Sequence, residues 1–451
     1  MHSDDLTHAS FPWKMALFVF AVSTIALHLN GRSFSNGETV PYRYMPIAIL
    51  RDHTFRLDAF PQLDHPSIYA VVRDKEGHLI SKKTALPGLF EVPAFAAYAL
   101  IFGELPRDEG AMIMLGSLTM STFAALAAMF LAAALDIQLR RRWLAPLAGV
   151  GLIALTPFWF AANGAWVHPL LGFFNAVTLW LIVRGRDKTS SWAWAGLMQG
   201  LAVATRVGSI PTALVFLAGA WLCPAPDSSV RRRRLAAVAL GALPGLIFLG
   251  VYNHVYFGHF ARSAFGAKPV SMIRLPFEGL AGFLMSPGEG IFYYSPALLL
   301  MFLALSRRVR MRWDVRLAFV AMFVHLLYWS CYLDWWGGSA WGPRYLFEAI
   351  PFAVYIAAVG FDSALAMPPI RKPLAWAAGA LCVFSMAVQA IGMFTWDNTY
   401  HQRFDPGFWS NDGEHWAWKA PYEPWWSLRN LPPQKPGYLK VKPAIRPNRD
   451  V

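Results

Sequence analysis

Long apolar stretches recur along this chain and constrain its fold more than any other feature. A helix needs about 20 apolar residues to cross the hydrocarbon core of a bilayer, and the stretches here are about 17 to 25 residues long. Only 15% of the residues are charged, whereas a soluble domain carries roughly 25%. We therefore predict an all-α membrane protein with about eleven transmembrane helices. The predicted spans are 11–29, 111–135, 143–162, 165–183, 192–205, 209–223, 235–257, 290–306, 316–333, 345–365 and 373–395.

Short basic clusters between the spans predict the orientation of the chain. Cytoplasmic loops are enriched in Lys and Arg, and an even number of predicted spans separates each cluster from the next. The clusters are 140–142, 184–188, 231–234, 307–312 and 371–372. They also account for the net charge of +13, because anionic lipid head groups attract such loops. We therefore expect membrane lipids, and no nucleic acid, as partners of the basic residues.

The even number of spans between the basic clusters also defines two segments outside the spans. The apolar segment 86–103 cannot be a further crossing without reversing the later loops, so we expect a helix that lies in the outer interface. The first outer loop then covers 30–110, within a transmembrane domain of residues 1–395. Residues 396–451 form a separate tail on the outer face. A loop as long as the first outer loop usually carries function.

Several polar groups fall on the predicted outer face, at the ends of spans. Glu38 lies in the first outer loop, His168 at a span junction and Arg206 between two spans. Arg206 has no acidic neighbour in the sequence, so either an anionic ligand or a distant carboxylate must balance its charge. The segments 286–296 and 334–344 are on the same face.

Three of these segments resemble motifs of the GT-C superfamily of bacterial integral-membrane glycosyltransferases. The run Ser35-Asn36-Gly37-Glu38-Thr39-Val40-Pro41-Tyr42-Arg43-Tyr44-Met45-Pro46 looks like their first outer loop, together with Leu50-Arg51 and Leu57-Asp58-Ala59-Phe60. The segments 286–296 and 335–344 are similar to further motifs. The superfamily includes protein mannosyltransferases and lipid A aminoarabinose transferases.

The resemblance implies an activity and a catalytic residue. Such enzymes transfer a sugar from a polyprenyl-phosphate donor to an acceptor glycan, lipid or protein at the outer face of the cytoplasmic membrane. The superfamily places its general base, usually Asp, soon after the first span, where this chain has Glu38. Asp52 and Asp58 are the alternative bases, and a solvated loop acid is the alternative role for Glu38.

Four cations are candidates for holding the donor phosphate. A planar guanidinium can bind two phosphate oxygens at once, which favours Arg344 and then Arg206. Lys82 and Lys83 precede the predicted interfacial helix and are further candidates, although lysines beside an anionic membrane often act only through surface electrostatics. Snorkelling at a span end is the alternative for Arg344.

Aromatic residues are candidates for contacts with the sugar or the lipid chain. They are Trp335, Trp336, Trp341 and Tyr294, and His168 joins them as a polar candidate. An interfacial aromatic belt is the alternative for the rings, and a hydrogen-bonded structural role is the alternative for His168.

The sequence shows no metal-ligand spacing and no nucleotide-phosphate loop, and its three cysteines lie far apart. We therefore expect no metal and no cofactor. The predicted function is sugar transfer with inversion, with a carboxylate as base. A transporter or flippase for a lipid-linked or anionic substrate is the alternative; it would favour charges in mid-span and an internal repeat, and we find no such repeat.

Overall fold

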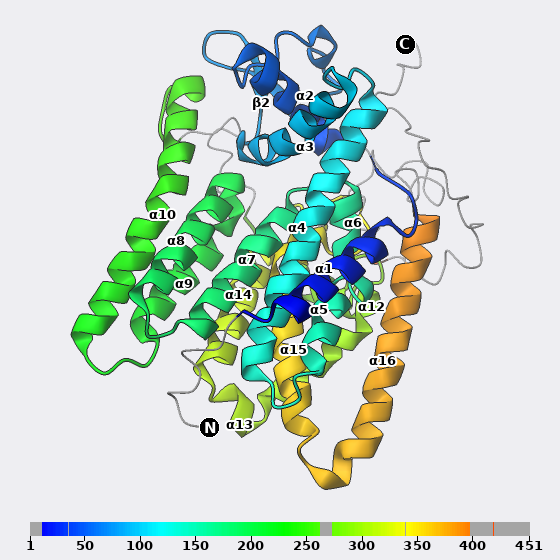
Figure 1. Cartoon of the computed structure of the whole chain (residues 1–451), viewed down its shortest axis with the longest axis vertical. Helices are drawn as coiled ribbons and strands as arrows, with labels where there is room; N and C mark the ends of the chain where they lie inside the picture. Colours follow the sequence, from blue (N-terminus) through cyan, green and yellow to red (C-terminus); the bar gives the residue numbers. More distant parts are fainter. Residues whose placement is uncertain (1–10, 35, 262–272, 339, 397–417, 419–451) are drawn as a thin grey trace.

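The computed structural model describes residues 11–34, 36–261, 273–338, 340–396 and 418, and nearly all of the regular structure is helical (Figure 1). The α-helices are α1 (Trp13–His28), α2 (Val40–Ile47), α3 (Leu86–Phe102), α4 (Glu109–Gln138), α5 (Leu144–Ala154), α6 (Phe158–Asn163), α7 (His168–Arg184), α8 (Thr189–Thr205), α9 (Ile210–Leu222), α10 (Ser228–Phe257), α11 (Phe277–Met285), α12 (Ile291–Tyr294), α13 (Arg307–Arg310), α14 (Trp313–Ser330), α15 (Ile350–Ala364) and α16 (Pro368–Thr395). The 3-10 helices are η2 (Gly37–Thr39), η4 (Pro61–Leu63), η5 (Val207–Ser209), η7 (Pro296–Leu305) and η8 (Arg344–Ala349), and η3 (Ala48–Asp52) is a π-helix. The strands β1 (Val71–Arg73) and β2 (Leu79–Ser81) pair antiparallel.

Within the described residues, four helical segments are long and apolar enough to cross a membrane. They are Glu109–Gln138, Ser228–Phe257, Arg344–Ala364 and Ile370–Thr395, and shorter apolar helices accompany them. The predicted total of about eleven spans stays a prediction. Two predicted spans are interrupted, because 143–162 divides into α5 and α6 before Pro157, and 290–306 divides into α12 and η7 before Pro296. Proline lacks the N–H that would continue the helical ladder.

The first outer loop folds into a cap at one end of the helical bundle (Figure 1). In the cap, α2, α3 and the β-hairpin pack around a second hydrophobic cluster, which also includes side chains of α4, α7, α8 and α10. Arg43 of α2 binds Glu109 at the start of α4 at 2.8 Å. The amide of Lys75 donates to the carbonyl of Tyr256, near the end of α10, at 3.0 Å. These contacts attach the cap to the start of α4 and to the end of α10.

The basic clusters lie at the opposite end of the bundle (Figure 1). The guanidinium of Arg141 and the amide of Arg140 both donate to the carboxylate of Asp362 near the end of α15. Arg234 of α10 reaches Asp187 at 2.8 Å. The fold therefore separates the basic loops from the cap, as the predicted orientation requires.

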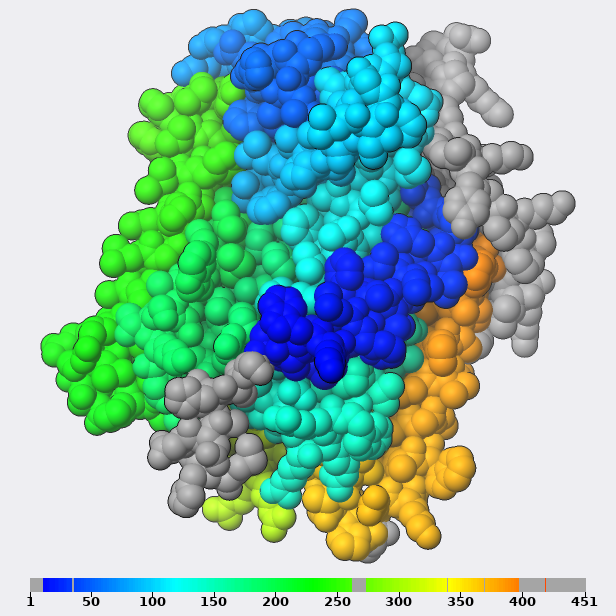
Figure 2. Space-filling model, in the orientation of Figure 1, coloured from blue at the N-terminus to red at the C-terminus, as the bar shows by residue number. Residues whose placement is uncertain are grey.

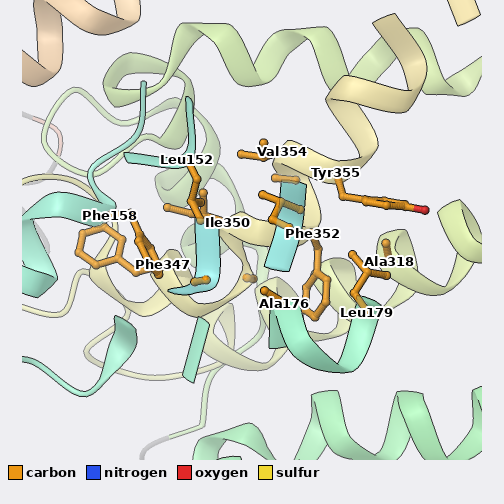
Figure 3. Close-up of a cluster of buried hydrophobic side chains, with 14 of the residues drawn as sticks. Leu152, Phe158, Ala176, Leu179, Ala318, Phe347, Ile350, Phe352, Val354 and Tyr355 are labelled. Carbon is orange, nitrogen blue, oxygen red and sulfur yellow. The ribbon is translucent and has the colours of Figure 1, made fainter. Parts of the chain in front are cut away.

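The centre of the bundle is a hydrophobic core built around α15 (Figure 3). Ile350, Phe352 and Val354 of α15 pack among side chains of the neighbouring α5, α7 and α14. All three are buried. This rigid core directly follows η8 in the chain, and so it fixes the position of the residues that precede α15.

Two long helices form the flanks of the bundle, α10 on one side and α16 on the other (Figure 2). Much of the apolar surface of both helices is exposed among the residues that the structure describes. Lipid chains would cover such surfaces in a membrane. The cap, in contrast, covers one end of the molecule (Figure 2).

Candidate functional site

The turn that carries Glu38 is fixed by Asn36. The side-chain oxygen of Asn36 accepts hydrogen bonds from the amides of Glu38 at 3.0 Å and Thr39 at 3.1 Å. Its side-chain nitrogen donates to the carbonyl of Gly164 at 2.8 Å. Asn36 is a good capping residue because its short amide can satisfy free backbone N–H groups at a helix start. Glu38 is therefore presented at a fixed place between the cap and the bundle.

The carboxylate of Glu38 lies between two cations. Its Oε2 is 2.5 Å from Lys83 Nζ, and its Oε1 is 3.0 Å from Arg344 Nη1. We call Glu38, Lys83 and Arg344 the ion triad. About a quarter of the Glu38 and Lys83 side chains is exposed (27% and 26%), so the triad is open to a ligand.

The two cations control the ionisation of Glu38. Burial alone would raise the pKa of the Glu38 carboxyl, but Arg344 and Lys83 outweigh it and hold that pKa well below its ordinary value. Burial lowers the pKa of Lys83, and Glu38 opposes that change. Glu38 is consequently an ionised carboxylate at neutral pH, and the ligand-free triad carries an excess of positive charge.

Arg344 is held by the backbone turn that precedes it and by aromatic rings. Gly337 has a φ of +72°, and a Cβ there would lie 2.8 Å from Arg344 Nε. Only glycine combines that conformation with such a close approach. The guanidinium carbon lies 5.1 Å from the ring centroid of Trp166 and 5.0 Å from that of Tyr345. Gly337 thus makes room for the arginine.

A second group of charges lies beside the triad; we call Arg206, His168, His325 and Glu348 the Glu348 cluster. Arg206 Nη1 lies 3.6 Å from Glu348 Oε1 and 3.3 Å from His168 Nδ1. His325 Nε2 lies 3.3 Å from Glu348 Oε1. The members come from the end of α8, the start of α7, α14 and η8.

The structure brings together five of the residues predicted from the sequence and adds two that were missed, Glu348 and His325. Glu38, Lys83 and Arg344 meet in the triad, and Arg206 and His168 meet in the Glu348 cluster. The sequence has no acid near Arg206 and left open whether an anionic ligand or a distant carboxylate balances its charge. Glu348 supplies this carboxylate from a distant segment, so a protein carboxylate faces Arg206. The one available signal was an acid inside an apolar run, four residues after Arg344.

The alternative bases lie in other surroundings. Asp52 is bonded to Arg51 beside it. Asp58 accepts from the amide of Leu79 at 3.0 Å and lies 3.1 Å from His78 Nδ1, so it holds the hairpin. Arg56, which is close to Asp58 in the sequence, binds Asp74.

Most of the candidate aromatic residues are buried inside the protein. Trp335 packs edge-on against Phe283, and Trp341 packs edge-on against Tyr294. Trp335, Trp341 and Tyr294 are at most 2% exposed, whereas Trp336 is half-buried. This packing supports a role for the three buried rings in shaping the turn that holds Arg344.

Lys82 adjoins the triad in the chain. Its amide donates to the carbonyl of Ala70 at 2.8 Å, which holds it in the hairpin. Among the described residues, no three His, Cys, Asp or Glu side chains are arranged to hold a metal ion. The predicted tail from 397 onward lies outside the described residues, apart from Trp418.

Comparisons with known proteins identify the fold. No protein-family model matches the sequence, and no curated protein matches it either. The structure is similar to that of ArnT from Cupriavidus metallidurans bound to undecaprenyl phosphate, with 14% identity, a TM-score of 0.56, and coverage of 87% of this chain and 67% of ArnT. The apo form of the same protein gives 14% identity and a TM-score of 0.53, with coverage of 85% and 66%, so this chain spans about two thirds of ArnT. The resemblance to the GT-C superfamily is therefore confirmed at the level of the fold: the chain is a multi-pass membrane protein with a GT-C-like fold.

Proposed function

We propose that this protein is an inverting glycosyltransferase that uses a polyprenyl-phosphate-linked sugar at the outer face of the cytoplasmic membrane. The observation that carries the proposal is the partly exposed ion triad, in which one carboxylate lies between a lysine and an arginine. A sugar transfer of this type needs both kinds of group. A base must accept the acceptor proton, and cations must stabilise the phosphate as it leaves.

Each residue of the triad has a role in the reaction. The acceptor hydroxyl or amine attacks the anomeric carbon of the sugar, while the bond between that carbon and the phosphate oxygen breaks. Glu38 takes the proton from the acceptor, and the polyprenyl phosphate leaves with the bonding electron pair. Lys83 and Arg344 neutralise the negative charge that grows on the phosphate. Attack from the face opposite the leaving group inverts the anomeric configuration.

Donor binding also activates the base. In the ligand-free protein Lys83 and Arg344 both bind Glu38, which lowers the pKa of its carboxyl and makes it a weak base. A donor phosphate competes for the same two cations. When they turn to the phosphate, the pKa of Glu38 rises and the carboxylate becomes able to accept a proton.

The surroundings of the triad support an outer-face reaction on a lipid substrate. Glu38 and Lys83 belong to the cap, which lies at the end of the bundle away from the basic clusters that we assign to the cytoplasm (Figure 1). Tyr252 of α10 donates to the carbonyl of Lys83 at 3.3 Å, which connects the triad to a helix with an exposed apolar surface. The structurally similar ArnT was solved with undecaprenyl phosphate bound. The acceptor is a glycan, a lipid or a protein.

The test is a transfer assay with purified protein in lipid nanodiscs. Polyprenyl phosphates that carry different radiolabelled sugars are offered with membrane extracts as the source of acceptor. We expect transfer from at least one donor, and Glu38→Gln should reduce its rate about 10²- to 10⁴-fold, the usual contribution of a general base.

Asp52→Asn is the matched control, since it neutralises another outer-loop acid that pairs with an adjacent arginine. It should keep the wild-type rate. Full activity of Glu38→Gln would exclude the proposed base, and absence of transfer from every donor would favour the transporter alternative.

A further inference from the structure

The buried carboxylate of Glu348 has no role in the reaction as described above. The residue is 1% exposed, and neither of its side-chain oxygens has a hydrogen-bond partner among the described residues. A buried carboxylate is expensive to desolvate unless opposite charges compensate for it. A nearby group of opposite charge must therefore compensate for the Glu348 carboxylate.

Arg206 is the only member of the Glu348 cluster that also reaches the surface. Its side chain is 20% exposed, whereas those of His168, His325 and Glu348 are at most 6% exposed. The carboxylate therefore lies on the closed side of Arg206. From that side it lies 3.6 Å from the guanidinium, close enough to attract it without saturating its hydrogen bonds.

Aromatic rings and histidines fix the rest of this arrangement. The guanidinium carbon of Arg206 lies 4.2 Å from the ring centroid of Trp329 and 5.0 Å from that of Tyr345. His325 Nε2 donates to the carbonyl of Tyr345 at 2.7 Å, so its ring is oriented by the backbone. The guanidinium of Arg206 thus packs against two aromatic rings, and the Glu348 carboxylate lies on its buried side.

Arg206 lies beside the ion triad, because its guanidinium carbon and that of Arg344 are each 5.0 Å from the ring centroid of Tyr345. It contributes to the low pKa of the Glu38 carboxyl, although less than Arg344 and Lys83 do. Arg206 is therefore a third cation near the phosphate site that is not bound to Glu38. Without an anion behind it, a partly buried guanidinium would gain solvation by turning outward, or would collapse onto Glu38.

We infer that Glu348 is a positioning residue, which holds Arg206 from behind so that its guanidinium faces the donor phosphate beside the ion triad. The inference rests on the proposed function, because it takes the ligand of that site to be a lipid phosphate. Glu348 acts through Arg206 and does not contact the substrate.

A double-mutant cycle tests this role. Glu348→Gln keeps the shape of the side chain and removes its charge, and Arg206→Gln removes the cation. We expect each variant to raise the KM for the donor, and the Kd for plain polyprenyl phosphate, by about tenfold, equivalent to about 1.4 kcal/mol. The kcat should change much less. In the double variant the loss should not exceed that of Arg206→Gln alone.

The matched control is Asp362→Asn. Asp362 is also a buried carboxylate paired with an arginine, and it lies near the other end of α15. Its substitution should lower the melting temperature while leaving the KM and Kd unchanged. Glu348→Asp retains the charge and should recover most of the binding lost in Glu348→Gln.

The outcomes are separable. Additive losses in the cycle, or wild-type binding by Glu348→Gln, would overturn the positioning role and leave the proposed function intact. So would a pair of Glu348 variants that cannot be purified folded while Arg206→Gln can, since Glu348 would then serve folding. A wild-type protein that binds no polyprenyl phosphate would overturn both. Binding with the predicted coupling, but without any sugar transfer, would contradict only the proposed function.

Discussion

At Glu38, two cations from distant parts of the chain share one carboxylate. Lys83 comes from the end of the hairpin, and Arg344 comes from the turn before α15. Part of the Glu38 and Lys83 side chains is exposed, so the charges of the triad are accessible to a phosphate as well as to each other.

Arg344→Lys tests whether the shape of the cation matters as well as its charge. Lysine cannot bind two phosphate oxygens through parallel N–H groups. We expect the KM for the lipid-linked donor to rise about tenfold, the effect of losing roughly 1.4 kcal/mol. Arg73→Lys is the control, because Arg73 is exposed and pairs with an acid of the cap. An unchanged KM in Arg344→Lys would contradict the proposed clamp.

Glu38→Gln should also change how stability depends on pH. The pKa of Glu38 is lower in the folded protein than in the unfolded chain. Its carboxylate therefore stabilises the fold above the unfolded pKa of about 4.3, and this contribution is lost as the pH falls through the folded pKa. We expect Glu38→Gln to have a lower melting temperature than wild type at pH 7, with a difference that narrows below about pH 4. A constant difference across the range from pH 7 to pH 3 would show that the cations do not act on Glu38 in this way.

The residues of the candidate site also show what the sequence could and could not predict. Glu38, Lys83 and Arg344 were identifiable because each lies at the end of an apolar segment or in a recognisable motif. Their mutual distances were not predictable, since they depend on how the cap folds onto the bundle. Glu348 was missed because its partners come from three other helices, and no local pattern records such a contact.

Among the elements, the contact between α8 and α10 depends on glycine. A Cβ at Gly245 would lie 2.2 Å from the backbone of Gly200, and one at Gly241 would lie 2.0 Å from the carbonyl oxygen of Ala193. Small residues allow helices in a membrane to approach closely and to gain van der Waals contacts along their length. This contact positions α10, whose far end holds the cap.

Gly245→Ala should therefore destabilise the protein although alanine favours helices. The added methyl group has no space, and overpacking of this kind costs about 1–3 kcal/mol. We expect a lower melting temperature in detergent, measured by tryptophan fluorescence. Gly379→Ala in α16 is the control, because nothing lies within 4 Å of the position of its Cβ. Equal melting temperatures for the two variants would show that the close packing of α8 on α10 is not required.

The boundaries of the elements were predicted less well than their existence. Apolar length alone merges α5 with α6, and it does not distinguish the 3-10 helix η7 from an α-helix. Pro157 and Pro296 mark both breaks in the sequence, but proline is also tolerated in continuous transmembrane helices. Tertiary packing determines whether a helix breaks or continues at a proline, and a hydropathy pattern carries no information about that packing.

On the scale of the whole molecule, charge divides the two ends of the bundle. The basic clusters gather at one end, and the cap with the ion triad forms the other (Figure 1). The GT-C-like fold persists at 14% identity to ArnT. Long apolar stretches predicted a bundle of helices, because the membrane restricts the possible folds, and the resemblance of a few motifs predicted its GT-C-like type.

Site-directed labelling can test the orientation. In a variant in which alanine replaces Cys223, Cys331 and Cys382, single cysteines are introduced by Glu76→Cys in the cap and Arg308→Cys in α13. Both positions are exposed. In intact cells, a membrane-impermeant maleimide should label the cysteine at 76 and not the one at 308. Inverted membrane vesicles should give the opposite pattern, and labelling of both from one side would contradict the predicted orientation.

The central claim is that the ion triad binds the phosphate of a lipid donor. A cryo-EM structure of the protein in nanodiscs with polyprenyl phosphate tests it most directly. We predict that the phosphate lies within hydrogen-bond distance of Lys83 and Arg344, with Arg206 facing it and at least one cation turned away from Glu38. A phosphate bound elsewhere, with the 2.5 Å and 3.0 Å contacts of Glu38 unchanged, would contradict the account.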